Sequence, residues 1–192
     1  MKPTFKPVYS DKKTLLDVVK EHKLGPDRCF LCGIQLVECD NATKEHVIPR
    51  WLQTRFNLWN QTLQLLNGTS IPYKSLTIPA CHQCNNRLSR IETSVERSTA
   101  VGKVELDKVD PVELFLWLAK IFFGILHKET FLALDRKNSS SGPIVSDEMI
   151  RAFEMIHYFL QAANVQMEFA GFFPASIFVF DLQVPPDKLY WF

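Results

Sequence analysis

The sequence predicts an α+β fold for this chain of 192 residues, and three observations favour that class. Two Cys-x-x-Cys pairs, Cys29 with Cys32 and Cys81 with Cys84, enclose a stretch whose short β-branched runs are typical of strands. The second half of the chain carries two long apolar segments with helical periodicity. With 46% apolar residues, the chain can bury a substantial core as one large domain or two small ones.

The same pattern divides the chain into three regions. Residues 1–27 are expected to form an N-terminal arm and a short helix, and residues 28–100 a metal-stabilised unit. Residues 109–192 are expected to form a mostly helical region with a short strand near its end. All five cysteines lie in the second region, so any thiolate site belongs to that unit.

Composition excludes several functional classes. The chain carries 22 basic and 21 acidic residues, so net charge gives no general attraction to nucleic acid, although residues 1–108 hold 16 Lys and Arg against 11 Asp and Glu. The most apolar segment, residues 112–127, contains Glu113 and Lys120 and is short for a bilayer, which predicts a buried helix and no membrane contact. The N-terminus lacks the apolar run of a signal peptide and the cysteines are typical of a reducing compartment, so we expect a cytoplasmic protein.

Turn signals and apolar periodicity give the expected elements in chain order. Helices are expected at residues 11–22, from Pro49 onward, and at 85–99, 109–128 and 146–164, and strands at 34–37, 71–78 and 177–180. Asn67-Gly68 marks a turn. Pro49 disfavours helix at the residue before it, which places His46 at a strand end or in a loop. The polar stretch 138–143 is expected to be a mobile loop.

The cysteine spacing indicates a structural zinc site. A Cys-x-x-Cys turn places two thiolates on one metal, and two such turns complete the tetrahedral shell that Zn²⁺ prefers. The predicted ligands are Cys29, Cys32, Cys81 and Cys84. Because the two pairs are far apart in the chain, the metal would pin two separate elements together. His82 is expected to point outward, and Cys39 to be a small apolar residue outside the site.

A second group of residues suggests hydrolytic chemistry. His46 is suited to take a proton from water near neutral pH, since the reference pKa of imidazole is about 6.5. Glu45 and Asn85 offer the hard oxygen atoms that Mg²⁺ or Mn²⁺ accepts alongside water and phosphate. A base and one metal are the parts needed to hydrolyse a phosphodiester.

The order of these motifs resembles the HNH endonuclease family, with its zinc-bound ββα-metal motif. The resemblance covers about residues 28–92 and lies in Cys-x-x-Cys, Glu-His-Val-Ile-Pro and Pro-Ala-Cys-x-x-Cys-Asn-Asn. It implies that the four paired cysteines hold structural zinc and that His46 is the general base. It also implies that Glu45 and Asn85 bind one catalytic divalent metal, Mg²⁺ or Mn²⁺, and that DNA is the substrate. The motif does not distinguish DNA from RNA.

The chain departs from the family pattern at two positions. The family's central Asn would fall within residues 75–81, where no Asn stands, and Asn60 or Asn67 could replace it only if the insertion folds back. Leu88 stands where a basic residue is often found. The candidates for phosphate contact are basic residues near the motif, with solvated helix surface as the alternative for each: Arg50, Arg55, Arg87 and Arg90.

Other prominent side chains are expected to have packing roles. Trp51 and Trp59 are expected in the core rather than on a base-stacking surface. His22, His127 and His157 lie on amphipathic segments without a cysteine pair nearby.

Two functions therefore follow from the sequence. The first is a metal-dependent DNA endonuclease, whose helices within residues 109–192 supply a partner surface, a dimer interface or target specificity. The second is an inactive zinc module of the same scaffold that binds nucleic acid or a protein. The missing Asn favours the second function, whereas Glu45, His46 and Asn85 favour the first.

Overall fold

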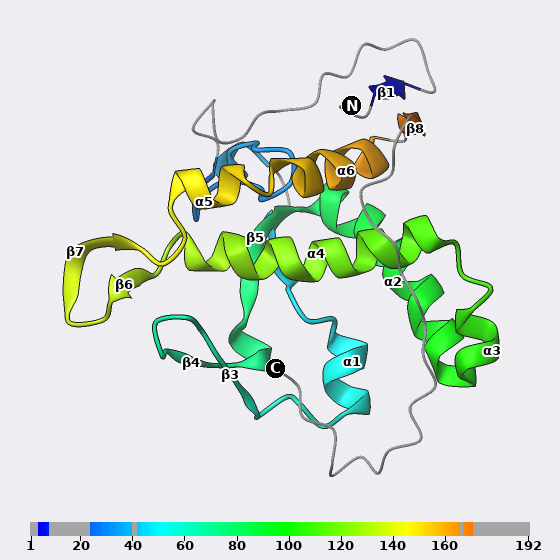
Figure 1. The fold of residues 1–192 in the computed structure, drawn as a ribbon, viewed down its shortest axis with the longest axis horizontal. Helices are drawn as coiled ribbons and strands as arrows, with labels where there is room; N and C mark the ends of the chain where they lie inside the picture. The colour runs from blue at the N-terminus through cyan, green and yellow to red at the C-terminus, as the bar shows by residue number, and fades with distance from the viewer. Residues whose placement is uncertain (1–3, 8–23, 40–41, 166, 171–192) are drawn as a thin grey trace.

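The computed structural model describes residues 4–7, 24–39, 42–165 and 167–170, and its elements mix helices with short strands as the α+β prediction requires (Figure 1). The strands are β1 (Thr4–Pro7), β2 (Ala42–His46), β3 (Thr62–Gln64), β4 (Ser70–Pro72), β5 (Thr77–Cys81), β6 (Ala133–Asp135), β7 (Asn138–Pro143) and β8 (Met167–Ala170). The α-helices are α1 (Arg50–Arg55), α2 (His82–Val101), α3 (Lys103–Leu106), α4 (Pro111–Glu129), α5 (Asp147–Arg151) and α6 (Glu154–Asn164). Two single 3₁₀ turns, η1 (Leu36–Glu38) and η2 (Tyr73–Ser75), complete the set.

A hairpin followed directly by a helix forms the centre of the molecule. Strands β2 and β5 pair antiparallel, with Glu45 opposite Ile78 and His46 opposite Thr77, and α2 begins at the residue after β5. The chain between these strands forms α1 and the β3–β4 hairpin. A two-stranded β unit followed by a helix is thus present over the range that resembles the HNH motif.

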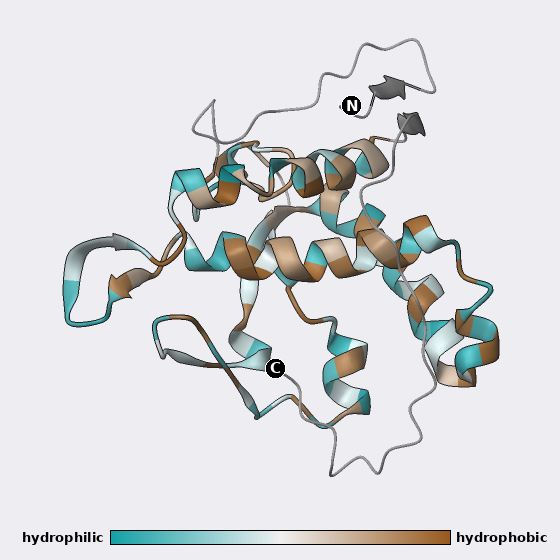
Figure 2. Cartoon of the chain, in the orientation of Figure 1, coloured by the Kyte–Doolittle hydropathy of each residue, from teal (hydrophilic) through white to brown (hydrophobic). Residues whose placement is uncertain are grey.

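Helix α4 packs across this hairpin. Asp110 caps its N-terminus by accepting a hydrogen bond from the amide of Val112, and Pro111 occupies the first turn, where its missing N–H costs nothing. Most residues of α4 are apolar. Figure 2 shows this helix as largely hydrophobic, whereas α2 alternates between hydrophobic and hydrophilic residues. The close approach occurs at Gly124, where an added Cβ would lie 3.0 Å from Cγ1 of Val47.

One hydrophobic core joins the two halves of the chain. It includes Phe30 and Leu31 from the first cysteine pair, Val47 and Ile78 from the hairpin region, and apolar residues of α4 and α6 such as Phe123 and Phe159. A smaller cluster, Val95, Val109 and Leu114, lies between α2 and the start of α4, with Trp51 and Trp117 against it. The helices after residue 109 therefore share a core with the cysteine-containing unit.

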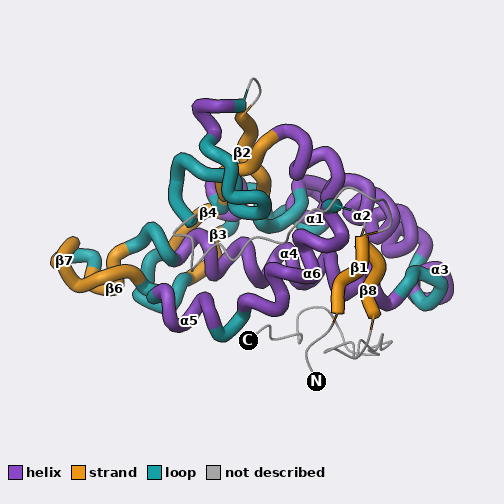
Figure 3. Tube along the Cα trace, turned by 90° about the horizontal axis from the view of Figure 1, so that it is seen from above, coloured by secondary structure: helices purple, strands orange, loops and turns teal. Residues whose placement is uncertain are grey.

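Two shorter hairpins lie outside this core. The β3–β4 hairpin turns at Gly68, whose φ of 76° is in the left-handed region, as the Asn67-Gly68 signal predicts. Figure 3 shows the β6–β7 hairpin at one end of the molecule and α3 at the other. Strand β1 pairs with β8 close to α6 (Figure 1).

The structure corrects several expected elements. Residues 138–143 form strand β7 paired with β6, so the prediction of a loop is wrong; a continuous run of polar and turn-forming residues gives no strand signal. The helix expected over 146–164 is two helices that break at Ala152 and Phe153. The strand expected at 34–37 is an isolated bridge at Gln35 followed by the first two residues of η1, and the one expected at 71–78 is divided into β4, η2 and β5. The elements expected at 11–22 and 177–180 lie outside the described residues.

The hydropathy and length of the helices bear on whether any of them could cross a membrane. Within the described ranges, none of the helices combines the length and the hydropathy needed to cross a bilayer. Helix α4, the most apolar of them, instead buries Lys120, His127 and Glu129 together with its apolar face.

We expect Gly124→Val to lower the free energy of unfolding by about 1–3 kcal/mol. The added side chain would meet Cγ1 and Cγ2 of buried Val47 at 3.0 and 3.1 Å, so α4 must move away from the hairpin. Urea unfolding followed by circular dichroism measures the change. Leu118→Val is the matched control, since it places the same residue at an exposed position of the same helix. Helix propensity cannot cause the loss in Gly124→Val, because valine forms helix better than glycine, so unchanged stability of this variant would contradict the crowding at Val47.

His127→Leu is expected to reduce the loss of stability in acid. The imidazole is fully buried, neither ring nitrogen has a hydrogen-bond partner among the described residues, and burial lowers its pKa to about 3. Below about pH 6.5 the unfolded chain binds a proton at this residue that the folded chain does not, so stability falls by about 1.4 kcal/mol per pH unit towards pH 3. Urea titrations at pH 7, 6 and 5 measure this slope. Wild type and variant share every other titrating group, so equal slopes would contradict the assignment.

Candidate metal centre and active site

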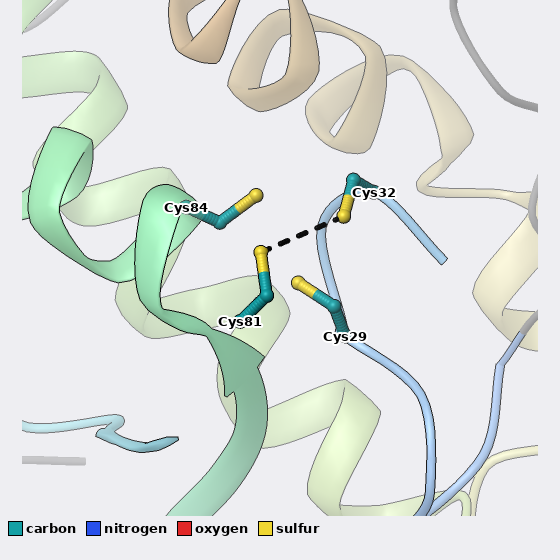
Figure 4. A group of neighbouring side chains, drawn as sticks. All are labelled: Cys29, Cys32, Cys81 and Cys84. Atoms are coloured by element: carbon teal, nitrogen blue, oxygen red, sulfur yellow. Dashed lines mark hydrogen bonds between the residues drawn. The ribbon is translucent and has the colours of Figure 1, made fainter. Parts of the chain in front are cut away.

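The four paired cysteines converge on one point, as predicted (Figure 4). Their sulfur atoms all lie within 4.8 Å of one another, and the Sγ atoms of Cys32 and Cys81 are 3.8 Å apart. Cys29 and Cys32 come from the loop before η1, Cys81 ends β5 and Cys84 lies in the first turn of α2. Four thiols from two tight turns are the donor set of a structural zinc site, so these residues could hold Zn²⁺.

The thiols perturb one another strongly. Hydrogen bonds from Cys32 and then Cys84 lower the pKa of Cys29 to about 2. The hydrogen bond with Cys29 raises the pKa of Cys32 to about 12, and the pKa of Cys84 is raised in the same way. One thiolate therefore forms readily and opposes the ionisation of its neighbours. A divalent cation at the centre would remove this conflict, because it favours the thiolate form of every ligand.

Helix α6 supports the cysteine cluster from behind. Asn164 donates from Nδ2 to Sγ of Cys84 over 3.4 Å. His157 donates from Nε2 to the carbonyl of Phe30 over 2.8 Å, and its Nδ1 accepts from Nε2 of Gln161 over 2.9 Å, which fixes one neutral tautomer. The expectation that His157 has no cysteine pair nearby is wrong, because the fold brings α6 onto the first pair. Such hydrogen bonds orient and tune metal ligands.

The two remaining candidates near the cysteines lie outside the cluster, as expected. His82 is exposed, and its Nε2 lies 2.8 Å from Nδ2 of Asn86. Cys39 is partly buried against the core, with its Sγ 3.6 Å from the carbonyl of Gln35.

Glu45 is buried and paired with a lysine. Its carboxylate forms an ion pair with Nζ of Lys120, a side chain of α4 that is only 1% exposed. The same ammonium lies 2.5 Å from Oε1 of Glu92 on α2 and donates to the carbonyl of His46 over 2.7 Å. Burial raises the pKa of Glu92, the charge of Lys120 partly offsets this effect, and Glu45 adds to it. Lys120 thus joins both strand β2 and helix α2.

His46 ends strand β2 with a partly buried ring. The imidazole lies against Trp59, with ring centroids 6.1 Å apart and an interplanar angle of 37°. Within the described part of the chain its buried Nδ1 has no hydrogen-bond partner. Burial, and then the positive charges of Arg50 and Lys120, lower the pKa of His46. The ring is therefore neutral at pH 7, which is the form that a general base requires.

Asn85 faces a different part of the hairpin from Glu45. Its Nδ2 donates to Oγ1 of Thr43 over 3.0 Å. Glu92, the α2 residue that shares Lys120 with Glu45, follows Asn85 by seven residues, or about 10 Å along the helix. In this structure Glu45 faces an ammonium and Asn85 faces a hydroxyl, so the binding of one divalent metal by this pair stays a prediction. Among the described His, Cys, Asp and Glu residues, only the four cysteines form a group of three or more arranged to hold a metal.

The candidate phosphate contacts divide into two kinds. Arg55 lies over the Trp51 ring at 4.7 Å and donates to Oγ1 of Thr99 over 2.8 Å, and Arg87 donates to the carbonyl of Asn164. These two arginines connect elements of the fold. Arg50 and Arg90 are exposed, as Arg55 is, but neither joins elements in this way, and Arg50 lies 5.7 Å from the centroid of the Trp59 ring beside His46.

The tryptophans also differ from each other. Trp51 is partly buried and stacks on Trp117 at 6.0 Å, in agreement with a packing role. Trp59 is 37% exposed, so the expectation that it belongs to the core is wrong. It lies instead on the surface next to His46, where a planar side chain can meet a ligand.

Neither candidate for the missing central Asn lies in the β2–β5 hairpin. Asn60 accepts from Nζ of Lys74 over 2.8 Å at an exposed position. Asn67 holds the β3–β4 turn, accepting from the amide of Thr69 over 2.9 Å and donating to the carbonyl of Ala133 over 2.8 Å. Leu88, which stands in place of a basic residue, is buried in the core.

Sequence reasoning missed the residues that connect the two halves of the chain. Lys120, Glu92, His157 and Asn164 all contact the candidate site from α2, α4 or α6. One signal was present: Lys120 stands among apolar residues on both sides, and a lysine in a buried helix needs an anionic partner.

Comparison of the chain with protein-family models, with curated proteins and with solved structures gives no match. The geometry of the site and the sequence motifs are therefore the grounds for any functional proposal.

Purified protein is expected to contain about one zinc ion per chain, measured by atomic emission after dialysis. Cys84→Ser should remove the zinc and lower the thermal midpoint, because three thiolates no longer complete the shell. Cys39→Ser is the matched control, since Cys39 lies outside the cluster. A zinc-free wild type that keeps its cooperative unfolding would contradict the proposed ligand set.

Proposed function

We propose that this protein is an HNH-type endonuclease that hydrolyses phosphodiester bonds in DNA. The observation that carries the proposal is the position of His46, which is the last residue of strand β2 in the β2–β5 hairpin. The cysteine cluster joins this hairpin to helix α2. Its lowered pKa keeps it in the basic form at neutral pH. The sequence resemblance and this geometry support the same assignment of the base.

His46 has a simple role in this reaction. Its unprotonated nitrogen takes a proton from water, the resulting hydroxide attacks phosphorus, and the opposite P–O bond breaks as the leaving oxygen takes a proton from solvent. Arg50 and Arg90 are exposed beside the unit and can bind neighbouring phosphates as charge-assisted donors. Trp59, exposed next to His46, offers a ring against which a base can stack.

Binding of Mg²⁺ or Mn²⁺ by Glu45 and Asn85 belongs to the same proposal. Such an ion would stabilise negative charge on the phosphate and on the leaving oxygen. It requires that Glu45 exchange Lys120 for the ion, since the carboxylate is paired with that ammonium.

A zinc module that binds nucleic acid without cutting it is the second candidate. The observation that favours it is the Glu45–Lys120 ion pair, in which a lysine already neutralises the carboxylate expected to bind metal. Arg50 and Arg90 would then bind phosphate groups without taking part in cleavage.

Nicking of supercoiled plasmid in Mg²⁺ or Mn²⁺ separates these functions. We expect wild type to cut, and His46→Ala to lose about 10²–10⁴-fold in rate because the base is absent. His82→Ala is the matched control, because His82 is an exposed histidine on the same unit whose Nε2 contacts the side chain of Asn86.

Three other results would change the assignment. Wild type that binds plasmid but leaves it intact with each metal supports the binding module. His46→Ala that cuts as fast as wild type contradicts the assigned base. Faster cleavage of a matched RNA strand would change the substrate but not the mechanism.

A further inference from the structure

A cavity of about 340 Å³ lies between the β2–β5 hairpin and the C-terminal end of α4. Part of its wall is apolar and includes Leu36, Pro79 and Phe131. Among the described residues that line it, the charged ones are two lysines, Lys44 of β2 and Lys128 of α4. A partly apolar cavity of this size with a few polar groups is typical of a ligand site.

The two lysines lack an anionic partner within the described chain. Nζ of Lys128 donates to the carbonyl of Thr77 over 3.2 Å, and the ion pairs of the described residues include neither Lys44 nor Lys128. The other two lysines of the described α-helices, Lys103 and Lys120, each pair with a carboxylate. The cavity is therefore a place where positive charge is not balanced.

The two ammonium groups also repel each other. Partial burial, and then the positive charge of Lys44, lower the pKa of Lys128. An anion between the two groups would oppose both effects, because it favours the charged form of a lysine that burial disfavours.

The position of Lys128 at the end of a helix does not by itself explain this arrangement. A lysine in the last turn interacts favourably with the helix dipole. Its ammonium, however, donates to a carbonyl of β5, and a second lysine from β2 lines the same cavity. The helix dipole accounts for neither of these two features.

The cavity lies on the same face of the hairpin as the candidate base. Alternate residues of a strand lie on one face, so Lys44 and His46 share a face, about 7 Å apart along β2, and Glu45 lies on the other. Thr77, whose carbonyl accepts from Lys128, is the residue of β5 paired with His46. An anion held by the two lysines would therefore lie next to His46.

We propose that Lys44 and Lys128 together bind one phosphate group of the DNA strand whose neighbouring phosphate reaches His46. The adjoining sugar would pack against the apolar wall at Pro79 and Phe131. The proposal rests on the proposed endonuclease function and adds a phosphate contact supplied partly by α4, outside the range that resembles the HNH motif. Lysine binds phosphate as a compact point charge, so two lysines can share one group.

DNA binding without cleavage tests this site. In zinc-loaded protein without Mg²⁺ or Mn²⁺, we expect Lys44→Gln and Lys128→Gln each to weaken binding of a short fluorescein-labelled duplex by about fivefold to tenfold, measured by anisotropy. In the double variant, the slope of log affinity against log salt should become shallower by about 0.9, because one phosphate contact is lost. Lys103→Gln is the matched control, since it removes the same charge from α3, beyond the opposite end of α4.

Several results would overturn the proposal. Binding by Lys44→Gln and Lys128→Gln that equals wild type shows that the cavity does not meet DNA. A slope that changes by about twice the expected value shows that the lysines hold two separate phosphates. Equal weakening by Lys103→Gln shows that net charge is responsible. If circular dichroism shows Lys128→Gln to be unfolded, the exposed Lys44→Gln decides alone.

A free nucleotide is another source of the same phosphate chemistry. We expect calorimetric titration of wild type with dAMP to show no saturable binding below millimolar concentrations, because a single nucleotide forms only part of the contacts of a strand. Tighter dAMP binding that the double variant loses, together with unchanged DNA binding in that variant, overturns the assignment to a strand.

The result is independent of the nuclease test. Lysine-dependent binding by a protein that never cuts plasmid keeps the phosphate site and removes the endonuclease. Plasmid cleavage by wild type, with DNA binding unchanged in the lysine variants, keeps the endonuclease and removes this site.

Discussion

The convergence of four cysteine sulfurs within 4.8 Å is the constraint on which the remaining structure depends. Cys81 is the last residue of β5 and Cys84 lies in the first turn of α2, so their shared position fixes the direction in which α2 leaves the hairpin. Cys29 and Cys32 bring the first loop to the same point, and the amide of Phe30 donates to the carbonyl of Pro79 in β5 over 2.9 Å. Through Asn164 and His157, α6 contacts the cluster as well. Closure of so long a chain segment restricts the unfolded state, and a bound metal would make that closure strong.

Helix α4 completes the site from the other half of the chain. Its residues meet the hairpin region at three successive levels: Lys120 at Glu45, Gly124 at Val47, and Lys128, which donates to the carbonyl of Thr77 over 3.2 Å. A helix that lies across a strand pair at this distance needs a residue without a side chain at the point of closest approach. Helix α4 therefore contacts the residues of the candidate site directly.

Much of the site was accessible from the sequence because its signals are local. Cysteine spacing predicts the cluster, Pro49 predicts the end of the extended segment at His46, and Asn67-Gly68 predicts its hairpin turn. The contacts that determine the chemistry are long-range: Lys120 meets Glu45, and His157 meets Phe30, across the whole fold. Periodicity shows that a helix is buried but not what it is buried against. For the same reason β7 was missed, since its polar residues are specified by pairing with β6 and not by an apolar face.

The energetics of the Lys120 cluster bear on function more than on stability. Replacing a buried ion pair with apolar residues of similar size is often neutral or stabilising, because desolvation offsets much of the attraction between the charges. Lys120 has apolar neighbours in α4, but an apolar residue in its place alone would leave the buried carboxylates of Glu45 and Glu92 without their cation, at a cost of about 3–5 kcal/mol. What an apolar residue could not supply is the hydrogen bond to the His46 carbonyl and the common link to Glu45 and Glu92. The cluster therefore fixes the main chain that carries the imidazole and keeps two carboxylates together beside it. A nuclease requires both effects, because its base must be positioned next to a cation site. A binding module would keep only the positioning of the main chain at His46.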